Sequence, residues 1–127
     1  MNEALKLKKK YKTERDKLFN DLIVSNDGFI FNNHHTKLVD GIVRDIVQNI
    51  VKEYSIDCFA LIAVGGYGRN DLSPKSDVDL LFLYKKSNKN IKNFITALNN
   101  NLWDVGLEVG ISFLTLKQVI IDSKKDT

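Results

Sequence analysis

Cysteine and proline are nearly absent from this chain of 127 residues, which contains one of each. With Cys58 as the single thiol, no disulfide can form within the chain, and its place in an apolar run predicts a small buried side chain. No apolar run approaches the roughly 18 residues of a membrane-spanning helix, and no apolar signal core follows the basic amino terminus. These absences exclude disulfide-rich secreted and membrane-spanning proteins, and they predict a cytoplasmic protein.

Several common site motifs are also missing. A dinucleotide-binding fingerprint that starts at Gly66 would need a third glycine at position 71, where the chain has Asp71. A Walker-type phosphate loop needs a Gly-Lys-Ser or Gly-Lys-Thr triplet, and the chain contains neither. His34 and His35 are adjacent and have no partner ligands at a workable spacing, so we expect them at the start of a helix and not in a zinc site.

The charge is distributed unevenly along the chain. Residues 1–17 contain seven Lys or Arg and three Asp or Glu, whereas the formal net charge of the whole chain is only +3. No aromatic cluster interleaves the lysines for base stacking, so we expect a solvated basic helical segment over residues 1–33 and no binding to nucleic acid. Residues 34–127 are then expected to form one functional core.

A glycine-rich turn lies between two short apolar runs, residues 58–64 and 78–84. Both runs are rich in β-branched, aromatic and Leu residues, which is typical of buried strands. Gly65, Gly66 and Gly68 follow the first run, where a missing Cβ permits positive φ and lets an anion approach main-chain N–H groups. The pattern predicts a phosphate-binding turn.

Charged residues follow the glycines. Asp77 and Asp79 are two positions apart, so a strand directs both carboxylates to one face, with Cα atoms roughly 6 to 7 Å apart. Two like charges at ~4 Å repel by about 1 kcal/mol in water and about 4 kcal/mol at an effective dielectric constant of ~20. Hard carboxylate oxygens near phosphates favour Mg²⁺, and Arg69 adds a planar cation for phosphate oxygens. Solubilising aspartates at a strand edge are the alternative, but the apolar neighbours Val78 and Leu80 favour a buried strand.

The run Gly-Gly-Tyr-Gly-Arg-Asn-Asp-Leu-Ser-Pro-Lys-Ser-Asp-Val-Asp-Leu-Leu, residues 65–81, resembles the nucleotidyltransferase superfamily that includes DNA polymerase β. That superfamily places Gly-Gly or Gly-Ser after a strand and Asp-x-Asp on the next strand. Within it, the run is similar to the uridylyltransferases that modify the PII nitrogen-signalling protein. Leu-Trp-Asp-Val-Gly-Leu-Glu-Val-Gly, from residue 102, resembles the next block of the same family. The resemblance covers about half of the chain.

The resemblance implies roles for individual residues. Gly65 and Gly66 would cradle a triphosphate, and Asp77 and Asp79 would hold the metal. Glu108 would be a third metal ligand and catalytic carboxylate, although a solvent-facing strand residue is the alternative. The further nucleotide-binding residues would be Gly68, Arg69 and Ser76.

The implied activity is transfer of UMP from UTP to a tyrosine of PII, with pyrophosphate leaving and with Mg²⁺ as cofactor. Where the family carries His and Arg in a Gly-His-Ser-x-Arg-Thr block, this chain has Ile111 and Leu114, which affects contacts to the acceptor or the nucleotide. Full-length relatives continue into a hydrolase domain and regulatory domains. We therefore expect a fragment or truncated transferase, with a stand-alone minimal nucleotidyltransferase and a non-catalytic nucleotide-binding remnant as alternatives.

The periodicity predicts the order helix, strand, short helix, strand, helix, strand, helix. The resemblance implies that these elements form an α+β fold, the nucleotidyltransferase fold, with a small mixed sheet flanked by helices. Apolar residues recur at helical spacing from Val39 to Tyr54, and again from Ile91 to Leu102, where Trp103 is expected to complete the buried face. Thr115 and Gln118 have the spacing of a capping box, which predicts that the last helix begins there.

Overall fold

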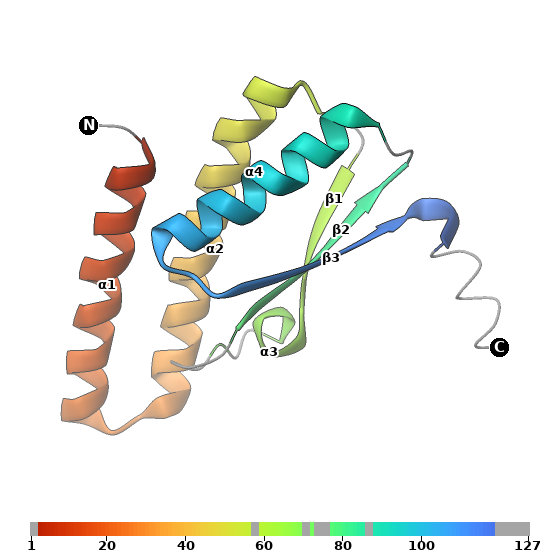
Figure 1. Cartoon of the computed structure of the whole chain (residues 1–127). Helices are drawn as coiled ribbons and strands as arrows, with labels where there is room; N and C mark the ends of the chain where they lie inside the picture. Colours follow the sequence, from red (N-terminus) through yellow and green to blue (C-terminus); the bar gives the residue numbers. More distant parts are fainter. Residues whose placement is uncertain (1–2, 57–58, 70–71, 73–76, 86–87, 119–127) are drawn as a thin grey trace, which may run out of the picture.

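The computed structural model describes residues 3–56, 59–69, 72, 77–85 and 88–118. Two long helices come first and are followed by strands alternating with helices (Figure 1). This α+β architecture, with a small mixed sheet flanked by helices, confirms the predicted nucleotidyltransferase fold. The elements are α1 (Glu3–Ser25), α2 (Gly28–Tyr54), β1 (Phe59–Val64), α3 (Gly65–Gly68), β2 (Val78–Tyr84), α4 (Lys89–Val105) and β3 (Val109–Thr115).

The sheet has three strands in the order β1-β2-β3. β1 pairs antiparallel to β2, and β3 pairs parallel to β2 after the α4 crossover. The long helices gather beside the sheet, and α3 lies at one end of it, where β1 finishes (Figure 1). Along β2, buried and more exposed residues alternate from Val78, as expected for a strand with one covered face.

Aromatic side chains form the contact between the sheet and α4. The rings of Phe59, Phe82 and Phe94 lie with their centroids 5.2 to 5.6 Å apart, and neither Phe82 nor Phe94 is exposed to solvent. Ring contacts of this kind add to the free energy gained from burying apolar area. The predicted buried face of α4 is confirmed, but the prediction for Trp103 was wrong: its side chain is 51% exposed, because the α4 stripe ends with Leu102 and Val105.

Helix α2 begins eleven residues earlier than its apolar periodicity suggested. The side chain of Asp27 accepts a hydrogen bond from the Ile30 N–H at 3.1 Å, which caps the helix there. The expectation that the histidines start this helix was therefore wrong, since His34 and His35 lie inside it. The boundary expected between residues 33 and 34, which separates the basic segment from the core, lies within the same helix.

The basic segment is also more integrated than we expected. α1 packs against both α2 and α4, and Leu7 and Tyr11 are buried in the main core. The lysines of α1 are exposed to solvent, as expected. The helix as a whole is not merely solvated, however, because its apolar side chains pack in the core. No helix in the described part of the chain is long and apolar enough to cross a lipid bilayer.

The predicted capping box after β3 is confirmed. The Thr115 N–H donates to Oε1 of Gln118 at 3.0 Å, and the Gln118 N–H donates to Oγ1 of Thr115 at 3.2 Å. A helical turn over residues 116–118 follows. Cys58 and Ser76 lie outside the described residues, so the predictions for them stay predictions.

Candidate functional site

Asp79 is the second residue of β2, which is the middle strand of the sheet. The register places it opposite Val64, the last residue of β1, and opposite Gly110 on β3. Its neighbours Val78 and Leu80 are buried beneath the helices, so strand alternation turns the Asp79 carboxylate to the exposed face. The fold therefore brings the glycine turn after β1 beside the predicted metal-binding carboxylate.

The carboxylate of Asp79 is flanked by two glycines. A Cβ atom added at Gly65 would lie 3.1 Å from Oδ2 of Asp79, and one added at Gly110 would lie 3.3 Å from Oδ1. Gly65 also has a φ of +63°, a conformation that other L-residues adopt only with strain. Both carboxylate oxygens thus stay free of side-chain cover from these two neighbours.

Asp77 and Glu108 lie at the start of the two parallel strands, each one residue before the paired Val78 and Val109. The Val78 N–H donates to the carbonyl oxygen of Glu108 at 2.8 Å, which holds the two strand ends together. Asp77 and Glu108 are both exposed. The fold therefore brings the backbones of all three predicted carboxylate residues to one end of the sheet.

Asp77 and Asp79 carry the hard carboxylate oxygens that Mg²⁺ prefers, and their role as metal ligands stays a prediction. Within the described residues, no group of three or more His, Cys, Asp or Glu side chains is close enough to hold one metal ion. Mg²⁺ is commonly bound by only one or two protein carboxylates together with substrate phosphates and water, so Asp77 and Asp79 match that pattern. The role of Glu108 as a third ligand stays a prediction.

The glycine turn forms a single helical turn, α3. A Cβ atom on Gly68 would lie 2.5 Å from the carbonyl oxygen of Ala63, so only glycine allows this close approach of α3 to β1. The Arg69 N–H donates to the carbonyl oxygen of Gly65 at 3.1 Å and closes the turn. The first N–H groups of a helical turn have no partner within it, which is the property that phosphate binding requires; this role for Gly65 and Gly66 stays a prediction.

Helix α2 supports the turn through a contact that the sequence did not predict. The hydroxyl of Tyr67 in α3 donates a hydrogen bond to Oδ1 of Asp40 in α2. Burial, and next to it this hydrogen bond, raise the pKa of the Tyr67 hydroxyl well above its ordinary value, so the group stays protonated. In the sequence, Asp40 lies among the polar positions of α2, and only its contact with Tyr67 gives it this role.

A cavity of about 340 Å³ lies on the other face of the sheet, between α2 and β1. Asp40, Arg44 and Gln48 of α2 line it, together with Ala63 and Tyr67. None of the predicted metal-binding residues faces it, since Asp79 points to the exposed face. Because Asp77, Asp79 and Glu108 are not among the residues that line this cavity, the cavity and the predicted metal site are distinct places.

Comparison with known protein families matches residues 42–126 to the model of the nucleotidyltransferase domain. The chain belongs to this family. The match takes in α3, the whole sheet and the C-terminal half of α2, which include the elements that surround Asp79. Transfer of a nucleotidyl group is the activity that defines the family.

Among characterised relatives, the chain is similar to enzymes named bifunctional uridylyltransferase/uridylyl-removing enzyme. Identity is 36% over 92 residues for the protein of Ralstonia nicotianae and 38% over 89 residues for that of Pseudomonas putida. It is 37% over 98 residues for that of Azospirillum brasilense. These matches cover 67 to 72% of this chain but only 10 to 11% of each relative, so the chain spans about a tenth of their length. No solved structure matches significantly.

Proposed function

We infer that the chain transfers UMP from UTP to a tyrosine hydroxyl of a PII signalling protein, with Mg²⁺ as cofactor. The observation that carries this proposal is the carboxylate of Asp79, which lies between Gly65 and Gly110 with both oxygens open to the exposed face. Family membership and similarity to uridylyltransferases support the reaction type and the choice of UTP. The expected cytoplasmic location stays a prediction.

In the proposed reaction, the acceptor oxygen forms a bond to the α-phosphorus of UTP. The bond from that phosphorus to the oxygen bridging the α- and β-phosphates breaks, pyrophosphate leaves, and the hydroxyl proton passes to a base or to water. Bound Mg²⁺ would supply charge neutralisation on the phosphates. Asp77 and Asp79 would hold the metal, the α3 N–H groups would bind phosphate oxygens, and Arg69 and Ser76 would contact the nucleotide.

The proposal is tested with purified chain, α-labelled UTP, Mg²⁺ and PII. We expect label on PII and an equal amount of released pyrophosphate, and we expect neither when the acceptor tyrosine is replaced by Phe or when EDTA is added. ATP, CTP and GTP serve as matched donors. Equal transfer from all four triphosphates would contradict the assignment to UTP, and pyrophosphate release without labelled PII would contradict the acceptor.

Two positions on β3 favour a second candidate, a domain that binds nucleotide without transferring it. Ile111 and Leu114 occupy the positions where the resembling family has His and Arg, and neither side chain can bind a phosphate or donate a hydrogen bond. Stabilisation of the chain by UTP and Mg²⁺ without any pyrophosphate release would favour this candidate. Restoring the pair as Ile111→His and Leu114→Arg would then be expected to produce measurable transfer.

A further inference from the structure

Leu72 is anchored to helix α2 through both of its backbone polar groups. Its N–H donates to Oγ1 of Thr36 at 3.0 Å, and its carbonyl oxygen lies 3.1 Å from Nδ1 of His35. Its side chain is fully buried in the core. Leu72 belongs to the connection between α3 and β2, which joins the glycine turn to the Asp-x-Asp strand.

The two α2 side chains are themselves held in place. A carbonyl oxygen can only accept, so Nδ1 of His35 carries the proton and donates, and in the neutral ring Nε2 accepts from the Tyr11 hydroxyl at 3.0 Å. The Thr36 hydroxyl donates to the carbonyl oxygen of Asn32 at 2.7 Å, which leaves its oxygen free to accept from Leu72. Both side chains are almost wholly buried, at 3% and 2% exposed.

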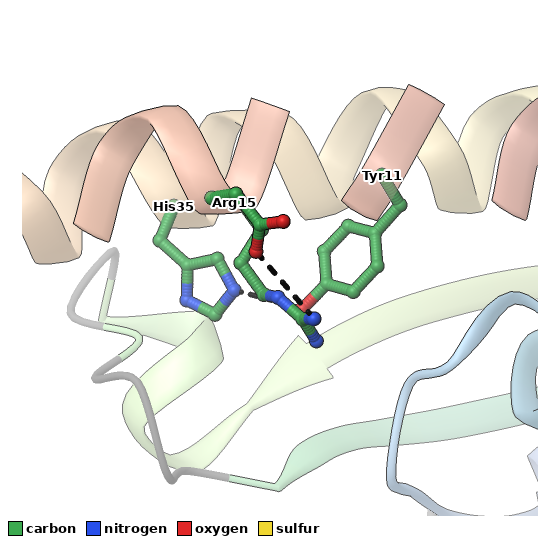
Figure 2. A network of polar contacts seen from close by, with 4 residues as sticks. Tyr11, Arg15 and His35 are labelled. Carbon is green, nitrogen blue, oxygen red and sulfur yellow. Dashed lines mark hydrogen bonds and ion pairs between the residues drawn. The ribbon is translucent and has the colours of Figure 1, made fainter. Parts of the chain in front are cut away.

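Aromatic packing fixes the imidazole further. The His35 ring neighbours the rings of Tyr11 and Phe31, with centroid distances of 6.1 and 5.4 Å. Figure 2 shows His35 and Tyr11 facing each other from the two helices, with Arg15 over the tyrosine ring. The α1–α2 pair therefore presents a rigid donor and a rigid acceptor to a single backbone unit.

We propose that His35 and Thr36 are positioning residues for the nucleotidyl-transfer site, acting by fixing Leu72; this inference rests on the proposed function. Leu72 lies four residues after the end of α3 and five before Asp77. Anchoring it divides the connection into two short spans, one leading from the glycine turn and one leading to the carboxylates. Small displacements of groups that bind a substrate cost large factors in rate, so a fixed point here has a measurable effect.

Substitutions at Thr36 separate positioning from packing. Thr36→Ser keeps the hydroxyl but removes a buried methyl, whereas Thr36→Val keeps the shape but removes the acceptor for Leu72. The matched control is Thr96→Val in α4, where the hydroxyl makes the same bond to the carbonyl four residues earlier, Lys92, on an exposed face. We expect Thr36→Val to weaken binding of Mg²⁺ and UTP roughly tenfold, with Thr36→Ser and Thr96→Val close to the native chain.

Substitutions at His35 repeat the test on the other bond. His35→Asn retains a donor near the Nδ1 position with poorer packing, and His35→Phe retains a ring without a donor. His34→Phe, at the exposed neighbouring position, is the control. If His35 acts by positioning, His35→Phe will bind Mg²⁺ and UTP more weakly than His35→Asn. We expect this order even if urea unfolding shows that His35→Asn is the less stable of the two variants. Binding losses that simply follow the stability ranking of the variants would overturn the proposal.

Amide hydrogen exchange gives a readout that does not depend on nucleotide. In Thr36→Val we expect faster exchange at Leu72 and at Val78, whose N–H bonds to Glu108 at the carboxylate end of the sheet. If the native chain binds no UTP, the proposed function fails, while this exchange pattern still tests the anchor. If exchange rises at Leu72 alone and Val78 is unchanged, the anchor does not reach the carboxylates and the inference is wrong.

Discussion

Gly65 and Asp79 lie so close that a Cβ atom on the glycine would be 3.1 Å from Oδ2 of the aspartate. The two residues come from different elements, and the antiparallel pairing of Val64 with Asp79 sets their separation. Glycine is therefore favoured at this position twice, once by the positive φ and once because a side chain there would push against the carboxylate.

Replacing Gly65 by Ala should lower the free energy of unfolding by about 1 to 2 kcal/mol, because alanine at positive φ is strained. It should also reduce Mg²⁺-dependent UTP binding, since the new methyl group presses on Oδ2 of Asp79. Urea unfolding and calorimetry measure the two effects. Gly41→Ala is the matched control: that position is in mid-helix with open space around it, and the change should stabilise the chain by about 1 kcal/mol.

Asp79→Asn keeps the shape of the side chain but removes its charge. Loss of a metal-binding carboxylate should lower UMP transfer by roughly a hundredfold or more, with little change in stability, because the side chain is exposed. Transfer from labelled UTP measures the effect. Asp104→Asn, at an exposed position in α4, should leave transfer unchanged. Native-level transfer in the Asp79 variant would refute the metal assignment.

Glu108→Gln tests the predicted third ligand. If Glu108 contacts the metal, the variant will need more Mg²⁺ to reach half-maximal pyrophosphate release, because one carboxylate oxygen donor is lost. A Mg²⁺ titration of the initial rate measures this. The control is Glu53→Gln on the exposed face of α2. A titration curve identical to that of the native chain would assign Glu108 to the solvent-facing role instead.

We expect the Tyr67 hydroxyl to make the free energy of unfolding fall in alkali. Its pKa is raised in the folded chain, so above about pH 10 the unfolded state loses this proton while the folded state keeps it. The unfolded state then binds fewer protons, and the free energy of unfolding falls as pH rises. Tyr67→Phe should be less stable by about 1 kcal/mol at neutral pH, because Asp40 loses its donor, and its decline above pH 10 should be shallower.

The pH profile is measured by urea unfolding between pH 7 and 11. Tyr54→Phe serves as a control, because Tyr54 is only partly buried against the same core. Parallel profiles for native chain and Tyr67→Phe would contradict the contribution of the Tyr67–Asp40 contact.

Local patterns were sufficient to predict the strands and the glycine turn, whereas the mixed pairing of the strands was implied only by the family resemblance. Strand alternation placed Asp79 on the face opposite Val78 and Leu80, and this is confirmed, because one covered face dictates the pattern. The Thr115–Gln118 cap was predictable for a similar reason, since both partners are three residues apart. Such features depend on neighbours along the chain.

Contacts between distant segments were not predictable in the same way. The bond from Tyr67 to Asp40 spans 27 residues, and that from Leu72 to Thr36 spans 36. In neither bond does the residue type of one partner indicate which distant residue the other partner is. The early start of α2 had a local signal, the Asp27 cap, but the weak apolar periodicity before Val39 concealed it. The prediction that Trp103 is buried was wrong because helical spacing alone does not show where the buried face of a helix ends.

The row that crosses the sheet through Val64, Asp79 and Gly110 combines two strand pairings of different sequence separation, from which we expect an order of events during folding. Val64 reaches Asp79 by a nearby antiparallel pairing, but Gly110 arrives only after α4 has crossed over and β3 has docked in parallel. Parallel pairing between segments far apart in sequence forms slowly. Nucleotide binding would therefore report the last step of folding, and its appearance after dilution from urea would time the docking of β3.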